Sequence, residues 1–283
     1  MVLFSTPDAE RTPHTADLMK PTSPIGVFDS GIGGLSILNH LHRTLPNEDL
    51  VYVADNGFAP YGERSPDEIR SRSRHIARFL VGQDVKAIVV ACNTATAVSI
   101  ADLRQQFDLP IIGVEPGLKP AANRTRSGVI GILATQGTLG SEKYSHLVDR
   151  HGREVAVVSQ VCNGLADRVE QGLIDNDETR SLLAGYLQPM IEQGADTIAL
   201  GCTHYPFLIP EIRRITGEAM EIIDTGQAVA SETARRLEAV NRNPQADRVG
   251  NVSFFSSGEP ATTSERVARY WQATVSVNPL PLS

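Results

Sequence analysis

The chain is poor in cysteine, in aromatic residues and in basic charge, and each shortage excludes a class of protein. Its 283 residues include three cysteines and 5% aromatics, and 26 Lys and Arg against 33 Asp and Glu leave a net charge of −7. So few cysteines argue against a disulfide framework and favour free thiols in a reducing cytoplasm. An acidic chain with few aromatics is a poor candidate for binding nucleic acid. No apolar run approaches the ~18 residues that a membrane-spanning helix needs.

The composition fits one large or two modest domains behind a polar leader. Hydrophobic residues make up 41% of the chain and charged residues 21%, which is ordinary for a globular protein. Residues 1–22 are polar, and Asp8, Glu10 and Arg11 stand where a signal peptide would need an apolar stretch. We therefore predict a mobile leader over 1–22 rather than a targeting signal.

Short apolar runs alternate with amphipathic segments along the rest of the chain. Their lack of polar alternation is typical of parallel strands covered on both faces. The runs stand at 25–28, 50–54, 87–92, 111–114, 129–133, 155–159, 197–202 and 221–224. The clearest helix is expected over 65–80, where Ser65 and Glu68 can form a capping box around Pro66. This alternation predicts a doubly wound α/β protein.

The two halves of the chain resemble each other. I-G-V-F-D-S at 25–30 matches I-G-I-L-A-T at 130–135, A-C-N-T at 91–94 matches G-C-T-H at 201–204, and Ile-Ile recurs at 111–112 and 222–223. The matched positions 25 and 130, 92 and 202, and 111 and 222 lie 105, 110 and 111 residues apart. A steady offset at successive landmarks predicts two similar α/β units.

These units define the expected domains. The second is predicted over 117–226, and the first over 23–116, completed by 227–283, where VSFFSSG reads as a strand and PATTSERVARYW as a helix. Two pseudo-symmetric units of this kind are expected to hold a ligand in the cleft between them, at the carboxyl ends of their strands.

Cys92 and Cys202 occupy equivalent strand ends in the repeat. Each alone would most often be a small buried hydrophobe. Their equivalence, with a Thr within two residues of each, favours two thiols that flank one ligand from opposite sides. A thiol at the N-terminus of a helix also has its pKa lowered by the positive end of the helix. Cys162 has no counterpart in the repeat and is interpreted as structural.

Polar residues beside the thiols extend the candidate site. Asp29 is either a turn residue that caps the next helix or a carboxylate that assists a thiol. His204 is either a hydrogen-bonded structural group or the group that polarises Cys202. The glycine turn that follows Asp29 lacks the full spacing of a dinucleotide-binding loop, so that signal is weak. Tyr61 and Gly62 lie in a loop that could contact a ligand. The cysteines and histidines have no spacing typical of zinc ligands.

Six motifs in order resemble those of glutamate racemase. They are F-D-S-G-I-G-G-L-S, A-D-N-x₃-P-Y-G-E-R, A-C-N-T-A, G-V-E-P-x-x-K-P-A, L-A-T-x-G-T and L-G-C-T-H-Y-P-x-L, and the match runs from about residue 24 to 258. This resemblance implies an enzyme that needs no cofactor and no metal and that inverts the α-carbon of glutamate with two cysteines. The D-glutamate formed would supply peptidoglycan synthesis in the cytoplasm.

The resemblance assigns roles to single residues. It makes Cys92 the base toward D-glutamate, assisted by Asp29, and Cys202 the base toward L-glutamate, assisted by His204. Glu170 is matched only loosely, to a further acid lining the site. The substrate contacts that it implies are Asp29, Ser30, Tyr61, Gly62, Asn93, Thr94, Thr135, Thr138, Thr203 and His204.

Partners and alternatives stay open at this point. The leader and the D-N-x₃-P-Y-G and K-P-A variants are most similar to members of which some need a peptidoglycan-precursor nucleotide as activator, and a homodimer is open. One departure is A-C-N-T-A-T, where the family often has Ser at the sixth position. The nearest alternative is an aspartate racemase or another two-cysteine enzyme of the superfamily. A non-catalytic amino-acid-binding protein and a metal-dependent hydrolase are further alternatives.

Overall fold

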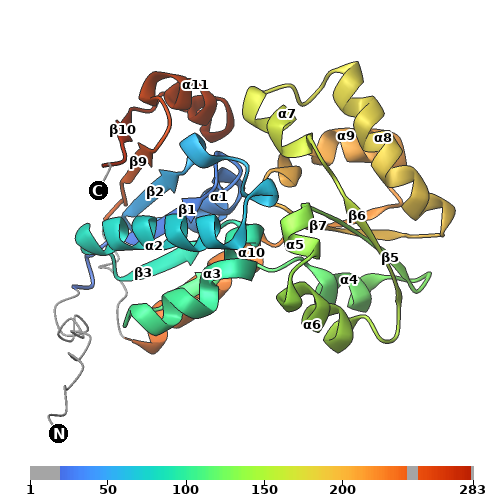
Figure 1. The fold of residues 1–283 in the computed structure, drawn as a ribbon, viewed down its shortest axis with the longest axis horizontal. Helices are drawn as coiled ribbons and strands as arrows, with labels where there is room; N and C mark the ends of the chain where they lie inside the picture. The colour runs from blue at the N-terminus through green and yellow to red at the C-terminus, as the bar shows by residue number, and fades with distance from the viewer. Residues whose placement is uncertain (1–19, 241–247, 282–283) are drawn as a thin grey trace, which may run out of the picture.

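The computed structural model describes residues 20–240 and 248–281. The leader predicted over 1–22 therefore lies almost entirely outside the described residues. The described chain forms two parallel β-sheets with helices on both faces of each (Figure 1). The predicted fold class, two doubly wound α/β units, is confirmed.

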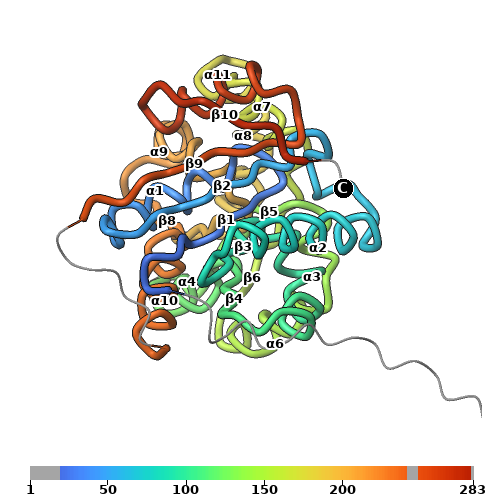
Figure 2. The backbone as a smooth tube through the Cα atoms, turned by 90° about the vertical axis from the view of Figure 1, so that its left-hand side faces the viewer, coloured from blue at the N-terminus to red at the C-terminus, as the bar shows by residue number. Residues whose placement is uncertain are grey.

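The first sheet consists of six parallel strands. They are β1 (Ile25–Asp29), β2 (Leu50–Ala54), β3 (Ala87–Val90), β4 (Ile111–Gly113), β9 (Val252–Ser256) and β10 (Val277–Pro279). Their order is β10-β9-β2-β1-β3-β4, and Figure 2 shows them following one another across the sheet. In the central strand β1, Ile25 lies opposite both Leu50 and Ala87. Burial on both faces explains why these strands lack polar alternation.

The second sheet repeats the centre of the first. Its strands are β5 (Val129–Ala134), β6 (Ala156–Val161), β7 (Thr197–Gly201) and β8 (Glu221–Ile223), all paired in parallel. Their order, β6-β5-β7-β8, matches β2-β1-β3-β4, so β9 and β10 are additions to the first sheet. We call the unit on the six-stranded sheet domain 1 and the unit on the four-stranded sheet domain 2. The boundaries read from the repeat stay a prediction.

Helices cover both sheets. In domain 1, α2 (Pro66–Gly82) and α3 (Asn93–Gln106) lie on one face, and α1 (Leu35–Thr44), α10 (Gly226–Ala239) and α11 (Pro260–Trp271) lie on the other (Figure 1). In domain 2, α4 (Leu118–Arg124) and α6 (Glu142–His151) lie on one face, and α8 (Asp177–Glu192) and α9 (Ile209–Thr216) on the other. One apolar cluster continues from the α1 face of domain 1 to the α8 face of domain 2.

Shorter elements lie at the strand ends between the sheets. They are α5 (Gln136–Leu139), α7 (Leu165–Gln171) and the 3-10 turns η2 (Asn56–Phe58), η3 (Tyr61–Glu63) and η4 (Tyr205–Leu208). These elements carry much of the candidate site, because the carboxyl ends of parallel strands are where such folds bind ligands.

Of the predictions for single helices and strands, some are confirmed and others are wrong. The helix predicted at 65–80 forms, and Ser65 and Glu68 make the reciprocal capping box. The expectation that every apolar run is covered on both faces is wrong for β6, which is an edge strand with half-exposed side chains. The short strand β10 was not predicted from the sequence. Across the described ranges, no helix is long and apolar enough to cross a membrane.

Candidate active site

The two thiols follow equivalent strands of the two domains. Cys92 lies two residues beyond the end of β3 and caps α3, where its sulfur accepts a hydrogen bond from the N–H of Ala95 at 3.4 Å. Its thiol also donates to Ser30 Oγ at 3.8 Å. Cys202 directly follows β7, and its sulfur lies 3.6 Å from His204 Nδ1. Both cysteines are buried.

Both thiols line a single cavity between the domains. Ten of the residues predicted as site members contribute to its wall, together with Pro60 and Ala166, which were missed: Ser30, Tyr61, Gly62, Cys92, Asn93, Thr94, Thr135, Cys202, Thr203 and His204. The cavity is small: its volume is about 10 Å³, which leaves room for about one water molecule. An amino acid can therefore reach the thiols only when the walls move apart.

Burial sets the proton affinity of the first thiol. It raises the pKa of the Cys92 thiol above its ordinary value, the charge of Asp29 raises the pKa further, and the Ala95 N–H opposes both. The lowering of its pKa that the helix N-terminus predicted is therefore outweighed. A positive charge brought next to the sulfur would be needed to favour the thiolate.

Asp29 lies behind the cavity wall, completely buried. Its Oδ2 accepts hydrogen bonds from the N–H groups of Gly34 at 2.9 Å and Gly31 at 3.3 Å, and its Oδ1 accepts one from the Thr203 hydroxyl at 3.3 Å. Burial raises the pKa of Asp29, and the nearby His204 partly offsets this. Asp29 thus acts on Cys92 through its charge and can hold a proton at a higher pH than an exposed carboxyl.

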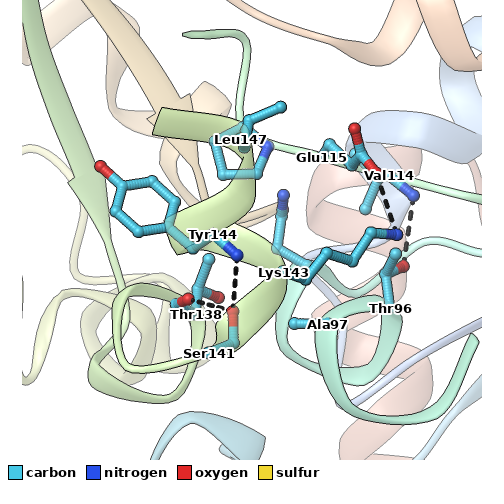
Figure 3. A pocket seen from close by; sticks show the side chains of 11 residues that line it. Thr96, Ala97, Val114, Glu115, Thr138, Ser141, Lys143, Tyr144 and Leu147 are labelled. Atoms are coloured by element: carbon cyan, nitrogen blue, oxygen red, sulfur yellow. Dashed lines mark hydrogen bonds and ion pairs between the residues drawn. The ribbon is translucent and has the colours of Figure 1, made fainter. Parts of the chain in front are cut away.

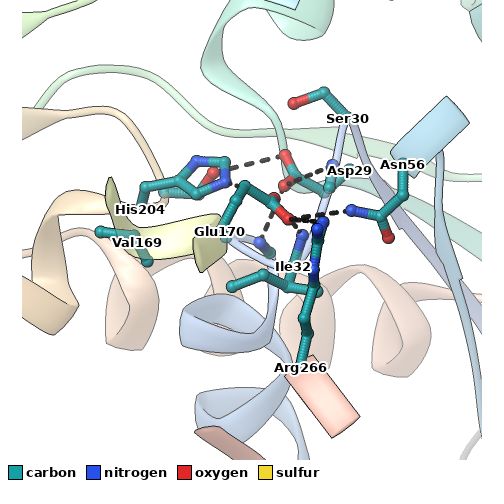
Figure 4. A network of polar contacts seen from close by, with 12 residues as sticks. Asp29, Ser30, Ile32, Asn56, Val169, Glu170, His204 and Arg266 are labelled. Carbon is teal, nitrogen blue, oxygen red and sulfur yellow. Dashed lines mark hydrogen bonds and ion pairs between the residues drawn. The ribbon is translucent and has the colours of Figure 1, made fainter. Parts of the chain in front are cut away.

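The second thiol ends a chain of buried polar groups. His204 bridges from the Cys202 sulfur at its Nδ1 to Glu170 Oε1 at its Nε2, the latter at 2.8 Å. Figure 4 shows His204 beside Glu170. Burial lowers the pKa of His204, but the contacts with Cys202 and Glu170 outweigh it and raise the pKa well above its ordinary value. For the Glu170 carboxyl, burial acts in the opposite direction and raises the pKa, but the contact with His204 outweighs burial and brings the pKa of Glu170 below its usual range. The structure therefore joins Glu170 to the site through His204.

Two glycines explain the turn after Asp29. A β-carbon on Gly31 would lie 1.9 Å from Glu170 Oε1, and one on Gly33 would lie 2.4 Å from His204 Nδ1. The turn thus lets the backbone of domain 1 approach a carboxylate and an imidazole of domain 2. The carboxylate that this turn approaches is the protein's own Glu170.

Three threonine hydroxyls meet where the domains touch. Thr94 of α3 lies 2.9 Å from Thr135 and 3.2 Å from Thr138, oxygen to oxygen, and Thr135 and Thr138 are 3.0 Å apart. Thr138 does not line the cavity but a neighbouring pocket, where Glu115 pairs with Lys143 of α6 at 2.9 Å (Figure 3). Asn93 lines both spaces, and within the described chain its buried Nδ2 has no hydrogen-bond partner. It is therefore a free donor beside the thiols.

The loop that carries Tyr61 and Gly62 is fixed from outside the cavity. Tyr61 donates its hydroxyl hydrogen to Asp55, which also accepts two hydrogen bonds from Arg72 at 3.0 and 2.7 Å. Asp55 belongs to the D-N-x₃-P-Y-G motif, so the sequence offered a signal for its role. Arg72 on α2 belongs to none of the quoted motifs, and its contact with Asp55 could not be predicted. Among the described residues, no three His, Cys, Asp or Glu are grouped so that they could hold a metal ion.

Known proteins share this architecture. The Asp/Glu/Hydantoin racemase family matches residues 25–233. A glutamate racemase of Pseudomonas entomophila (strain L48) is 49% identical over 263 residues, covering 92% of this chain and 98% of that protein. Glutamate racemase isoform RacE1 from Bacillus anthracis superposes with a TM-score of 0.84 at 35% identity, covering 92% of this chain and 98% of that one. Escherichia coli glutamate racemase, solved with L-glutamate and the activator UDP-MurNAc-Ala, gives a TM-score of 0.80 at 30% identity, with 92% and 99% covered.

The fold is that of the two-domain racemases, which are isomerases. The chain belongs to the Asp/Glu/Hydantoin racemase family.

Proposed function

We propose that this protein interconverts L-glutamate and D-glutamate by transferring the α-proton between two thiols. The observation that supports this most is that Cys92 and Cys202, from equivalent positions of the two domains, line one small cavity. One base can invert a carbon only if it or the substrate swings round, whereas two bases on opposite faces need no such motion.

The proposed reaction balances without any further reactant. When L-glutamate is the substrate, the Cys202 thiolate takes the α-proton, and the electron pair of the C–H bond stays on the α-carbon and its carboxylate. The Cys92 thiol then gives its proton to the opposite face. The product is the D-enantiomer, and Cys92 is left as the thiolate, ready for the reverse reaction.

The wall of the cavity suits an amino acid. The substrate's ammonium group would bring positive charge next to the thiols and so favour a thiolate, against the raised pKa of Cys92. Its carboxylates could accept hydrogen bonds from the free Nδ2 of Asn93 and from hydroxyls of the threonine cluster. Such donors, fixed before the reaction, stabilise the charge that develops on the carboxylate as the α-proton leaves.

Glutamate is chosen as substrate because of the relatives. The Pseudomonas entomophila protein is named for it, and the Escherichia coli structure was solved with L-glutamate and the activator UDP-MurNAc-Ala. We propose the same substrate here, with a peptidoglycan-precursor nucleotide as an activator and with the D-glutamate used for peptidoglycan in the cytoplasm, whose reducing conditions suit two free thiols. The homodimer stays a prediction that size-exclusion chromatography with light scattering would check.

The test is a substrate comparison by circular dichroism, run with and without a chelator. L-glutamate, D-glutamate and L-aspartate are each incubated with the protein, first alone and then with UDP-MurNAc-Ala. The proposal expects loss of optical activity with both glutamate enantiomers and not with aspartate. Racemisation of aspartate alone, or tight glutamate binding with no turnover, would favour the alternatives of an aspartate racemase or a binding protein. Loss of activity caused by the chelator would contradict the metal-free proposal.

A further inference from the structure

A carboxylate of domain 2 is held mainly by domain 1. Glu170, in the last turn of α7, accepts hydrogen bonds from the N–H of Ile32 at 2.7 Å and from Asn56 Nδ2 at 2.9 Å, and its Oε2 lies 3.4 Å from Nη1 of Arg266 (Figure 4). These three partners belong to domain 1. Its fourth partner, His204 at 2.8 Å, belongs to its own domain.

The helix that carries Glu170, α7, also accepts hydrogen bonds from helix α11 of domain 1. On α11, Tyr270 donates its hydroxyl hydrogen to the carbonyl of Val169 at 2.6 Å, and Arg269 donates to the carbonyl of Gln171 at 3.1 Å. Carbonyls at the end of a helix have no partner within it, so α11 supplies what α7 lacks. Arg266, Arg269 and Tyr270 share one face of α11 because they are three and four residues apart.

The two thiols therefore differ in which domain supplies the groups that surround them. The two hydrogen-bond partners of Cys92, Ser30 and Ala95, belong to domain 1, as does Asp29, whose charge acts on it most; the weaker charge of Cys202 comes from domain 2. The chain from Cys202 through His204 depends on Glu170, whose position depends on the other domain. A separation of the domains that admits substrate would take from Glu170 three of its four partners, Ile32, Asn56 and Arg266.

We propose that closure of the domains completes the Cys202 half of the site, and that Asn56 and Arg266 are positioning residues that hold Glu170 on His204. Cys202 is then assisted through Glu170 only in the closed protein, whereas the hydrogen bonds of Cys92 with Ser30 and Ala95 lie within domain 1 and do not need closure. A buried charged pair is stable only while its remaining hydrogen bonds are satisfied, which is the task of the two positioning residues. The link to turnover rests on the proposed function; the link to His204 does not.

The first test uses Asn56→Ala, which removes a donor without changing charge. The readout is the ring titration of His204, followed by NMR in the substrate-free protein with labelled histidine and assigned with His204→Asn. The other titratable groups that face His204, namely Asp29, Cys202 and Glu170, are unchanged. If Glu170 leaves His204, the ring titrates at lower pH. If Glu170 only loses a donor and keeps its place, the ring titrates at the wild-type pH or higher, which would overturn the proposal.

The second test is kinetic and uses α-deuterated L- and D-glutamate. Because enantiomers have equal free energy, kcat/KM must be equal in the two directions, and isotope effects carry the information about single steps. We expect kcat to fall by about tenfold to 100-fold, the loss typical of one hydrogen bond to a charged group. We expect the isotope effect to rise for L-glutamate, whose proton Cys202 removes, and to fall for D-glutamate. Equal changes for both enantiomers would show a general structural effect and overturn the proposal.

Two controls on α11 sharpen the result. Glu265→Ala changes the exposed neighbour of Arg266 and is expected to leave both isotope effects unchanged. Arg266→Lys is expected to recover most of the activity lost in Arg266→Ala, since it keeps a positive charge near Glu170. If the wild type does not racemise glutamate, the proposed function fails, and the titration of His204 still decides whether Asn56 positions Glu170.

Discussion

The turn at Gly33 lies against the imidazole that contacts Cys202. A β-carbon there would lie 2.4 Å from Nδ1 of His204, 2.6 Å from Cε1 and 2.7 Å from Cγ. Nonbonded heavy atoms need ~3.5 Å, so in Gly33→Ala the ring must shift by about 1 Å. The ring is buried and held at both nitrogens, and Nδ1 is the atom that faces the Cys202 sulfur. The shift therefore changes the contact between His204 and Cys202 on which the proposed mechanism depends.

A misplacement of this size can cost about 100-fold in rate, so we expect Gly33→Ala to lower kcat by that order. Overpacking of a buried site also costs about 1–3 kcal/mol of stability, which urea unfolding measures alongside racemisation followed by chiral chromatography. The control is Gly185→Ala in α8, an exposed helical position with open space around its β-carbon. There we expect unchanged kcat and a gain of about 0.5–1 kcal/mol. Wild-type kcat and wild-type stability in Gly33→Ala would refute the geometry of the His204 contact.

The remaining predictions concern the thiols and pH. Cys92→Ala and Cys202→Ala should each abolish racemisation and leave the far-ultraviolet circular dichroism unchanged, whereas Cys162→Ala should keep near-wild-type kcat; racemisation by either of the first two would contradict two-thiol transfer. The folded protein raises the pKa of His204 above its ordinary value of 6.5 despite burial, through its contacts with the Cys202 thiol and the Glu170 carboxylate. The stability that the charged ring contributes is therefore complete below about pH 6.5 and is lost as pH rises through the folded-state pKa. Urea unfolding of wild type and His204→Asn should give a stability difference that shrinks toward alkaline pH, and a difference independent of pH would reject this.

Much of the fold could be predicted because its strands and helices are marked by patterns within short segments of the sequence. The apolar runs that became β1, β2 and β3 are buried on both faces, so their composition alone marks them as parallel strands. The capping box at Ser65 is likewise a local signal. Equivalent positions in the repeat placed Cys92 and Cys202 together, since similar units put similar residues at similar strand ends. β10 escaped prediction because three residues, Val277–Pro279, carry too little pattern.

The parts of the site that could not be predicted are long-range contacts. Glu170 meets Ile32 and Asn56 from 138 and 114 residues away, and Arg266 meets it from 96 residues away. No spacing rule links such positions; only the docking of the two domains brings them together. Arg72, which holds the Tyr61 loop through Asp55, was missed for the same reason.

The central claim is that two thiols on opposite faces share the proton transfer. The most direct test runs racemisation in deuterated water from L-glutamate and stops it early, then measures deuterium at the α-carbon of both enantiomers by mass spectrometry. Two-thiol transfer predicts D-glutamate that carries solvent deuterium, beside remaining L-glutamate that keeps its hydrogen. D-glutamate that retains the hydrogen of the substrate would show that a single base returns the same proton, and would contradict the account.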